Sequence, residues 1–191
     1  MGTRGLLGFI IKGRRKGTYN HYDSYPTGLG DLIVKFLLSL SPKELQSMAE
    51  RVENIVWVTE DEPPSKEMQE EYSGKGFANV DVGKQQLDTW YCLLRECQGA
   101  KALPLICTGE LQHIVDDTNF AKQSLFCEWA YFIDFEKRVL ETWRGFQNQV
   151  SPDNPFGQEM KDGYGPIAMV NTTPFDQLSS SLMDGMEQQC R

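Results

Sequence analysis

The densest group of side chains that could carry chemistry lies at residues 19–25, which read Tyr-Asn-His-Tyr-Asp-Ser-Tyr. Alternation along a β-strand would place Tyr19, His21 and Asp23 on one face, where an imidazole and a carboxylate could meet. Ser24 is the next residue in the sequence and lies at the predicted turn. A histidine beside a carboxylate can act as a general base, and backbone N–H groups opening a following helix could stabilise an oxyanion. We therefore predict catalytic roles for His21, Asp23 and Ser24.

The same residues also have a purely structural interpretation. The tyrosines could pack across strands, and Asp23 or Ser24 could serve only to hydrogen-bond the turn. His113, the second histidine of the chain, falls on an amphipathic segment and is expected to be structural. A catalytic Ser/His/Asp triad is disfavoured, because the three residues of a working triad usually converge from separate segments.

A further candidate site residue lies on the alternating segment 127–135, where Glu128 and Asp134 fall on the more polar side. Asp134 is close to a predicted turn and is expected to be exposed. Glu128 is predicted to bind a guanidinium or an amine, and to line one cleft with the corner that follows the second strand. Arg4 precedes the first predicted strand and could pair with Glu128 or with Asp23.

Neither a metal nor a cofactor is expected. The cysteines lack C-x-x-C spacing and have no histidine at ligand distance, so we expect reduced thiols in the core. The chain has no glycine-rich phosphate-binding motif and no G-x-S-x-G elbow, which argues against self-contained nucleotide chemistry. The five cysteines are Cys92, Cys97, Cys107, Cys127 and Cys190.

Charge is unevenly distributed along the chain. The 191 residues carry a formal net charge of −8, which argues against a general nucleic-acid binder and against DNA as a partner. Residues 59–72 alone hold six acidic side chains and one lysine. Four cations lie on one predicted turn, where they could contact a phosphate backbone or form an ordinary solvated hairpin end. This basic tip consists of Lys12, Arg14, Arg15 and Lys16.

The N-terminal half predicts a hairpin followed by two helices. Residues 6–11 are apolar on both strand faces, and residues 18–23 are rich in β-formers. The Pro- and Gly-containing turn 24–30 leads into an amphipathic helix that ends near Leu40. A capping box at Ser41 then starts a second helix, which is expected to end near residue 52.

The remaining chain gives weaker signals. We expect a short strand at 54–59, a loop containing Pro63-Pro64, a helix at 84–98 and a weaker helix at 109–119. A second hairpin is predicted from strands at 127–135 and 139–143, and a terminal helix at 175–189. The sequence thus predicts one globular domain over 1–191, with an acidic loop near 59–72 and a loop-rich part from about 145.

Together these elements predict an α+β fold, in which a mostly antiparallel sheet built from two hairpins carries packed helices. No apolar run approaches the roughly 18 residues that a membrane span requires. No secretory signal is recognisable either, so we expect a cytoplasmic protein that does not contact a membrane. The oligomeric state is left open.

The opening Met-Gly-Thr-Arg-Gly and the run at residues 19–30 resemble a group of small fungal proteins, as does the Cys-Glu-Trp-Ala-Tyr run at 127–131. The resemblance covers roughly the first 40 residues and the second predicted hairpin. In these motifs the chain is similar to the fungal arginine-containing cyclodipeptide synthases. Those enzymes take two amino acids from aminoacyl-tRNAs, join them and cyclise the product.

The resemblance implies an aminoacyl transferase of secondary metabolism that needs no cofactor and uses aminoacyl-tRNA, including arginyl-tRNA, as substrate. Such an enzyme needs a base for the α-ammonium group, donors for an oxyanion and an acid that binds arginine. His21, the turn after Ser24 and Glu128 could supply them, and the basic tip could hold the tRNA acceptor end. The predicted substrate-binding residues are Arg4, Asn20, Tyr25, Glu128 and Tyr131.

Two other classes of function stay open. In a non-enzymatic binding module, the tyrosine-rich run would be a structural corner, and the acidic loop or the terminal helix would engage a partner. A small Ser/His/Asp hydrolase is the third possibility. The product formed from charged tRNAs distinguishes the synthase from both.

Overall fold

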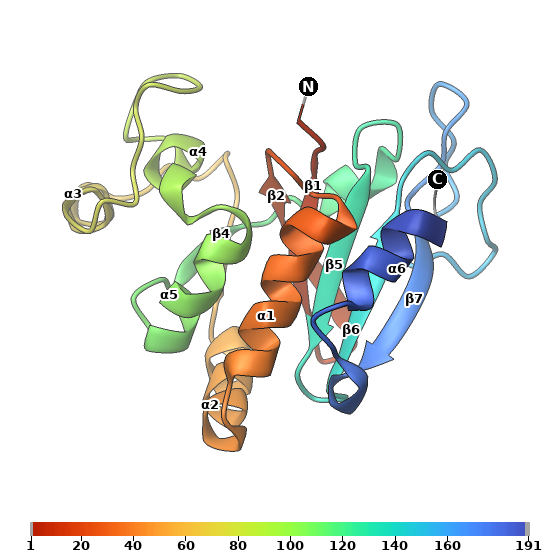
Figure 1. The fold of residues 1–191 in the computed structure, drawn as a ribbon. Coiled ribbons are helices and arrows are strands. Elements are labelled where there is room, and N and C mark those ends of the chain that lie inside the picture. Colours follow the sequence, from red (N-terminus) through yellow and green to blue (C-terminus); the bar gives the residue numbers. More distant parts are fainter. Residues whose placement is uncertain (1, 190–191) are drawn as a thin grey trace.

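The fold is built on a five-stranded sheet, seen in a computed structural model that describes residues 2–189 (Figure 1). The strand order is β2-β1-β5-β6-β7. Neighbouring strands run antiparallel except β1 and β5, which pair in parallel with Gly5 beside Trp129 and Phe9 beside Ile133. The strands are β1 (Gly5–Ile11), β2 (Arg14–Asn20), β5 (Trp129–Asp134), β6 (Val139–Arg144) and β7 (Ala168–Pro174).

Helices and a second, two-stranded sheet fill the long connections. The small sheet pairs β3 (Val56–Val58) with β4 (His113–Val115) in parallel. A single π-helical turn at Pro26–Gly30 leads directly into the first helix. The helices are α1 (Asp31–Ser39), α2 (Pro42–Glu53), α3 (Lys66–Gly74), α4 (Trp90–Leu93), α5 (Ala102–Thr108) and α6 (Leu182–Gln189). Within the described residues, no helix is both long and apolar enough to cross a bilayer.

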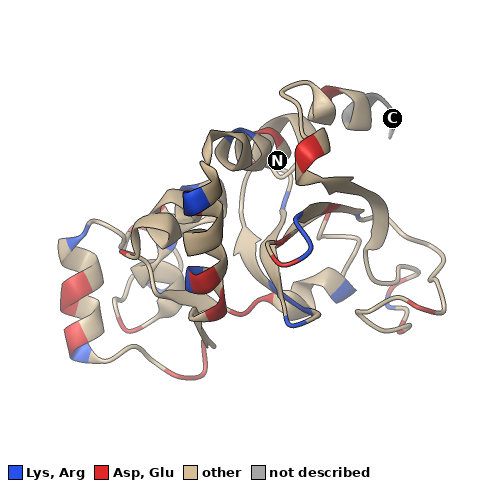
Figure 2. Cartoon of the chain, turned by 90° about the horizontal axis from the view of Figure 1, so that it is seen from below, with Lys and Arg blue, Asp and Glu red and all other residues tan. Residues whose placement is uncertain are grey.

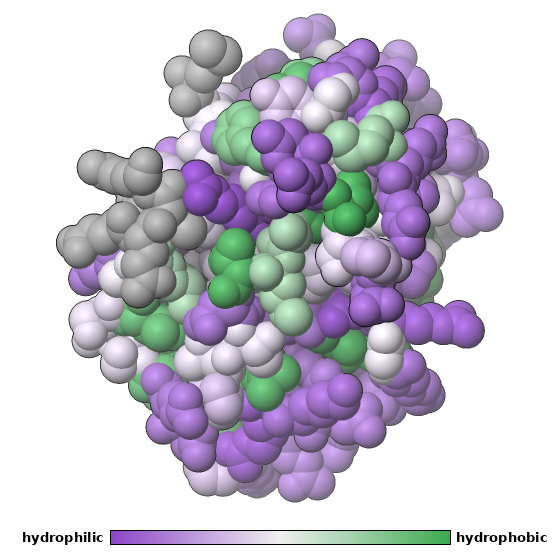
Figure 3. All heavy atoms as spheres, turned by 90° about the vertical axis from the view of Figure 1, so that its right-hand side faces the viewer, coloured by the Kyte–Doolittle hydropathy of each residue, from purple (hydrophilic) through white to green (hydrophobic). Residues whose placement is uncertain are grey.

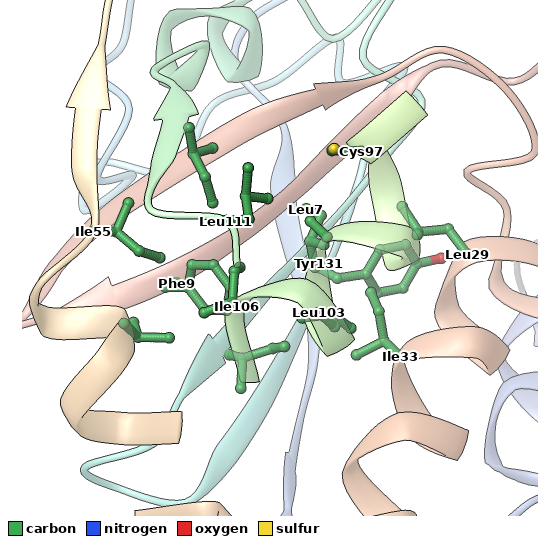
Figure 4. Close-up of a cluster of buried hydrophobic side chains, with 14 of the residues drawn as sticks. Leu7, Phe9, Leu29, Ile33, Ile55, Cys97, Leu103, Ile106, Leu111 and Tyr131 are labelled. Atoms are coloured by element: carbon green, nitrogen blue, oxygen red, sulfur yellow. The ribbon is translucent and has the colours of Figure 1, made fainter. Parts of the chain in front are cut away.

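The two central strands bury both of their faces, which explains why their sequences are apolar throughout. On one face, Leu7, Phe9 and Tyr131 pack with Ile33 of α1 and Ile106 of α5 (Figure 4). On the other face a smaller cluster forms under the long loops of the C-terminal half. Its members include Leu6, Ala130, Phe132, Trp143, Phe156 and Ile167. The edge strand β7 is the exposed side of the sheet, where apolar and hydrophilic side chains are interspersed (Figure 3).

Several expectations are confirmed. The class is α+β and the sheet is mostly antiparallel. Ser41 caps α2 through a capping box, in which its hydroxyl accepts from the Glu44 N–H and the Glu44 carboxylate accepts from the Ser41 N–H. Pro63-Pro64 lies in a loop, although the second part of the acidic segment folds as α3. Cys92, Cys97, Cys107 and Cys127 are free thiols, while Cys190 lies outside the described residues.

Other expectations were wrong. The segment 84–98 contains only the four-residue helix α4 and a 3-10 turn. Its apolar side chains have helical spacing, but successive turns bury them here and a continuous helix is not needed. Residues 113–115 of the predicted weak helix form β4, since the β-branched pair Ile-Val aligns with β3. The region after 145 contains β7, and the terminal helix begins only at Leu182. Asp134 is 3% exposed, because its carboxylate accepts the Lys137 N–H and folds back onto the turn.

The basic tip is partly neutralised by the fold. Lys12 and Arg14 are exposed, and acidic residues elsewhere in the chain are spread over several elements, α3 among them (Figure 2). Arg15 forms a bidentate ion pair with Glu141 of β6, at 2.8 and 2.6 Å. The indole N–H of Trp143 donates to the same carboxylate, and Lys16 pairs with Asp116. The Arg15 pair therefore connects β2 with β6 across the two central strands.

Removing Arg15 should destabilise the fold, because it leaves the nearly buried Glu141 carboxylate without its cation. We expect Arg15→Met to lower the free energy of unfolding by about 2–3 kcal/mol in urea titrations followed by circular dichroism. The double variant Arg15→Met/Glu141→Gln should recover most of this loss. Arg14→Met at the exposed neighbouring position is the control and should change stability by less than about 0.5 kcal/mol. Equal losses in the two single variants would contradict a structural role for the pair.

Candidate functional site

Two neighbouring pockets meet at the carboxyl end of β2. The inner pocket, of about 360 Å³, is lined mostly by apolar side chains and includes Tyr19, Glu60, Trp90, Tyr91, His113 and Asp117. The corner pocket, of about 580 Å³, is more open and polar and includes Asn20, His21, Asp23, Tyr25, Arg95 and Glu96. Gln98 lines both pockets. Adjacent residues of one strand thus face two cavities of different character.

A buried hydrogen-bond network fixes the corner between the pockets. The Asn20 side-chain amide donates to the Ser24 hydroxyl at 2.7 Å and to the Tyr22 carbonyl at 2.5 Å. The Tyr131 hydroxyl donates to the Ser24 carbonyl at 3.0 Å, and Ser24 is fully buried. Asp23 adopts a left-handed conformation with φ of 52°, which turns the chain sharply. This corner is therefore rigid and packed.

β2 ends at Asn20, so the predicted strand does not extend to His21 or Asp23, but the Tyr19 and His21 side chains still contact each other. The Tyr19 hydroxyl lies 2.9 Å from His21 Nδ1. Burial, followed by the nearby cations Arg95 and Arg4, lowers the pKa of His21. The imidazole is accordingly neutral at pH 7. In the tautomer that carries its proton on Nδ1 and donates to Tyr19, the Nε2 lone pair can accept a proton.

The inner pocket holds two carboxyl groups against apolar walls. The Asp117 N–H donates to the Gly17 carbonyl at 2.8 Å and its carboxylate accepts the Tyr19 N–H at 2.9 Å, so the residue covers the edge of β2. Burial, helped by the nearby acids Glu60 and Asp116, raises the pKa of Asp117 to about 6. Burial also raises the pKa of Glu60. Among residues 2–189, neither carboxylate forms an ion pair with a lysine or arginine.

Aromatic side chains complete the inner pocket. The His113 ring stacks on Trp90, with centroids 5.6 Å apart and planes at 18°, and its Nδ1 lies 2.6 Å from the Tyr72 hydroxyl. Burial lowers the pKa of His113, so this imidazole is also neutral at pH 7. A pocket with flat apolar walls, a half-buried carboxylate at Asp117 and an exposed one at Glu60 is suited to a ligand with an apolar stem and a cationic end.

The structure brings some of the predicted site residues together and separates others. Asn20, His21, Asp23 and Tyr25 line the corner pocket. Ser24 and Tyr131 are fully buried in the network beneath it, where their polar groups serve the corner. A catalytic role for Ser24 therefore stays a prediction that would require the corner to open.

Arg4 directly precedes β1 and Glu128 directly precedes its parallel neighbour β5, and the Arg4 guanidinium acts electrostatically on both Tyr19 and His21. The Glu128 N–H donates to the Arg4 carbonyl at 2.9 Å, whereas the Arg4 guanidinium lies over the Phe126 ring, 5.1 Å from its centroid. Within the part of the chain that the structure describes, Arg4 forms no ion pair with Glu128 or Asp23. Glu128 is not among the residues that line either pocket, so the expected shared cleft is not present.

Sequence reasoning missed the inner pocket. Its residues come from five separate segments, and Glu60 was expected only as part of an acidic loop. A signal did exist at Asp116-Asp117, because two acids directly follow the β-branched run of β4 and a strand end is a common position for site residues. Among the described residues, no cluster of histidine, cysteine and carboxylates could hold a metal ion.

Replacing Asp117 by asparagine should stabilise the protein. Because its pKa is about 6 in the folded chain and ordinarily 3.8, the unfolded chain releases this proton first as pH rises. The free energy of unfolding therefore falls between about pH 4 and 6 in the wild type, and Asp117→Asn should lack this contribution. Asparagine can still accept the Tyr19 N–H.

We expect Asp117→Asn to be more stable by about 1–2 kcal/mol at pH 7 and unchanged at pH 3.5, as measured by urea unfolding at each pH. Asp61→Asn, on the exposed neighbouring loop, should show no such pH-dependent gain. A loss of stability at pH 7 would mean that the Asp117 charge serves the fold.

No protein-family model, curated protein or solved structure matches this chain.

Proposed function

We propose that this protein is an aminoacyl-tRNA-dependent transferase that joins arginine to a second amino acid and cyclises the product, as a cyclodipeptide synthase does. The observation that carries the proposal is that Tyr19, which lines the inner pocket, contacts His21, which lines the corner pocket, while Gln98 lines both. A reaction between two amino acids needs two side-chain pockets whose openings meet where the reacting groups lie. An acid–base group is needed at the same point.

His21 has the properties that this reaction requires of a base. The attacking α-ammonium group has a pKa of about 7.7–8.0 and must lose a proton before its nitrogen can attack. The neutral imidazole of His21 can accept that proton, since burial, followed by Arg95 and Arg4, keeps its pKa low. The Gln98 side chain accepts a hydrogen bond from Arg95 through its oxygen, which directs its NH₂ group as a donor for the oxyanion.

The chemistry balances without an external energy source. In the first step the amine nitrogen of one aminoacyl group attacks the ester carbonyl of the other, forms an amide and releases a tRNA ribose hydroxyl. In the second step the free amine of the dipeptidyl ester attacks the remaining ester carbonyl, which closes the ring and releases the second tRNA. Two ester bonds break and two amide bonds form.

The inner pocket fits the arginine side chain. Its apolar walls can cover the three methylene groups, and Trp90 and Tyr91 offer aromatic faces to a guanidinium. Glu60 and Asp117 supply carboxylates, and a bound cation would lower both pKa values and so stabilise the charged forms. We therefore assign arginine to these two acids, while Glu128 lies outside both pockets.

The burial of Ser24 counts against a Ser/His/Asp hydrolase, because its hydroxyl faces Asn20 inside the corner. A binding module for a cationic small molecule would use the inner pocket alone. Such a module would have no need of His21. Formation of a cyclic dipeptide therefore distinguishes the transferase from the binding module.

Incubation with charged tRNAs should yield a cyclic dipeptide that contains arginine, detected by mass spectrometry. Replacing Asp117 by asparagine should reduce its formation roughly 30-fold or more, because a charge-assisted hydrogen bond contributes about 2 kcal/mol. Glu60→Gln should act in the same direction, whereas Asp61→Asn next to it should retain full activity. The absence of any arginine-containing product with every partner amino acid would reject the proposed function.

The pH profile tests the base. Because the pKa of His21 is lowered by burial and by Arg95, its contribution to the acidic limb of kcat/KM should lie below pH 6.5. Arg95→Gln removes a cation that disfavours the imidazolium, so this limb should move to higher pH, whereas His21→Ala should abolish it. The substrate ammonium titrates identically in all three proteins. Superimposable limbs in wild type and Arg95→Gln would exclude His21 as the base.

A further inference from the structure

We propose that Tyr22 and Arg95 form a stacking platform for the terminal nucleoside of the tRNA acceptor end. This inference rests on the proposed function and names where its nucleic-acid substrate docks. The platform is formed by the Tyr22 ring, the Arg95 guanidinium beneath it and the neighbouring His21 ring.

The platform is an exposed aromatic ring held by ordered neighbours. Tyr22 is 58% exposed although it lies in the middle of the packed corner. The His21 ring meets it edge-on at 4.2 Å between centroids, and the Arg95 guanidinium carbon lies 5.8 Å from its centroid. Arg95 also lies 5.5 Å from the centroid of Tyr91. A pre-positioned, solvent-facing ring is the feature that proteins use to stack an unpaired base.

The location of the platform matches the covalent structure of the substrate. An aminoacyl group is esterified to the ribose of the terminal nucleotide, so the base lies within one nucleotide of the reacting carbonyl. Tyr22 and Arg95 line the corner pocket, and Tyr91 lines the inner pocket. A base on Tyr22 therefore places the attached ester at the boundary of the two pockets, beside His21.

The distribution of charge favours docking of the tRNA end at Tyr22 and Arg95 over docking at the basic tip. Arg15 and Lys16 of the tip already pair with Glu141 and Asp116. Arg95 donates to the neutral Gln98 side chain and, among the described residues, forms no ion pair with a carboxylate. Its guanidinium can therefore serve a terminal phosphate while it supports the ring. One stacked base and one phosphate contact suit a protein whose net charge is −8.

The test compares two uncharged tRNAs, one with the complete CCA end and one that lacks the terminal adenosine. Because stacking contributes about 1–3 kcal/mol per base, wild-type protein should bind the complete tRNA roughly tenfold more tightly in fluorescence anisotropy titrations. Tyr22→Ala should remove this preference, Tyr22→Phe should keep it, and Arg95→Ala should reduce it. Phe126→Ala, which removes another exposed ring beside an arginine but outside both pockets, should leave it unchanged.

Equal affinity of the wild type for the two tRNAs would overturn the platform, and so would a preference that survives in Tyr22→Ala. Product analysis of the same wild-type protein separates this failure from failure of the proposed function. A cyclic dipeptide formed without any preference for the terminal adenosine rejects the platform and retains the synthase. A preference that depends on Tyr22, in a protein that forms no cyclic dipeptide, retains the platform and rejects the synthase.

Discussion

The contact between Asn20 and Gly99 is the constraint on which the site depends. A Cβ atom at Gly99 would lie 2.3 Å from the Asn20 side-chain oxygen, and Gly99 has a φ of 61°, so a residue with a side chain fits neither the space nor the backbone. This approach holds the segment of Arg95 and Gln98 against the end of β2. Since Gln98 lines both pockets, the contact closes the wall that they share. The network from Asn20 to Ser24 and Tyr131 then ties the corner to the central strand β5.

The rigid corner creates two opposite electrostatic environments within one strand end. On one side, burial and then the nearby cations lower the pKa of His21 and keep its imidazole neutral, which suits a proton acceptor. On the other side, partial burial raises the pKa of Asp117, and the exposed Glu60 carboxyl beside it has a raised pKa as well, which suits the pair to a cationic ligand. Catalytic sites commonly contain neighbouring titratable groups whose pKa values are shifted in different directions by their surroundings. The fold accepts an unfavourable half-buried acid at Asp117 that an uncharged amide could replace.

Local patterns predicted the elements that depend on neighbouring residues. The apolar run of β1, the alternation of β5 and the capping box of α2 each reflect contacts within a few positions. The parallel pairing of β1 with β5 joins residues more than 120 positions apart, and no local pattern indicates it. Trp90, Leu94 and Cys97 recur at helical spacing because all three side chains are buried. A short helix followed by a turn buries them just as effectively as one continuous helix would. The corner cluster was found because its residues are consecutive, whereas the inner pocket is assembled from distant segments.

An acidic protein that handles tRNA needs to recognise one feature of the RNA rather than its charge. A chain with a net charge of −8 gains little from general attraction to phosphates, and its exposed acids repel most of the tRNA surface. The acceptor end is single-stranded and its terminal base is unpaired, so stacking on a rigid ring is available there and not along the duplex. The acidic surface and the corner would therefore have complementary effects on tRNA binding. In the proposed function, the acidic surface would weaken unproductive binding along the RNA, while the corner would retain the one end that carries the amino acid.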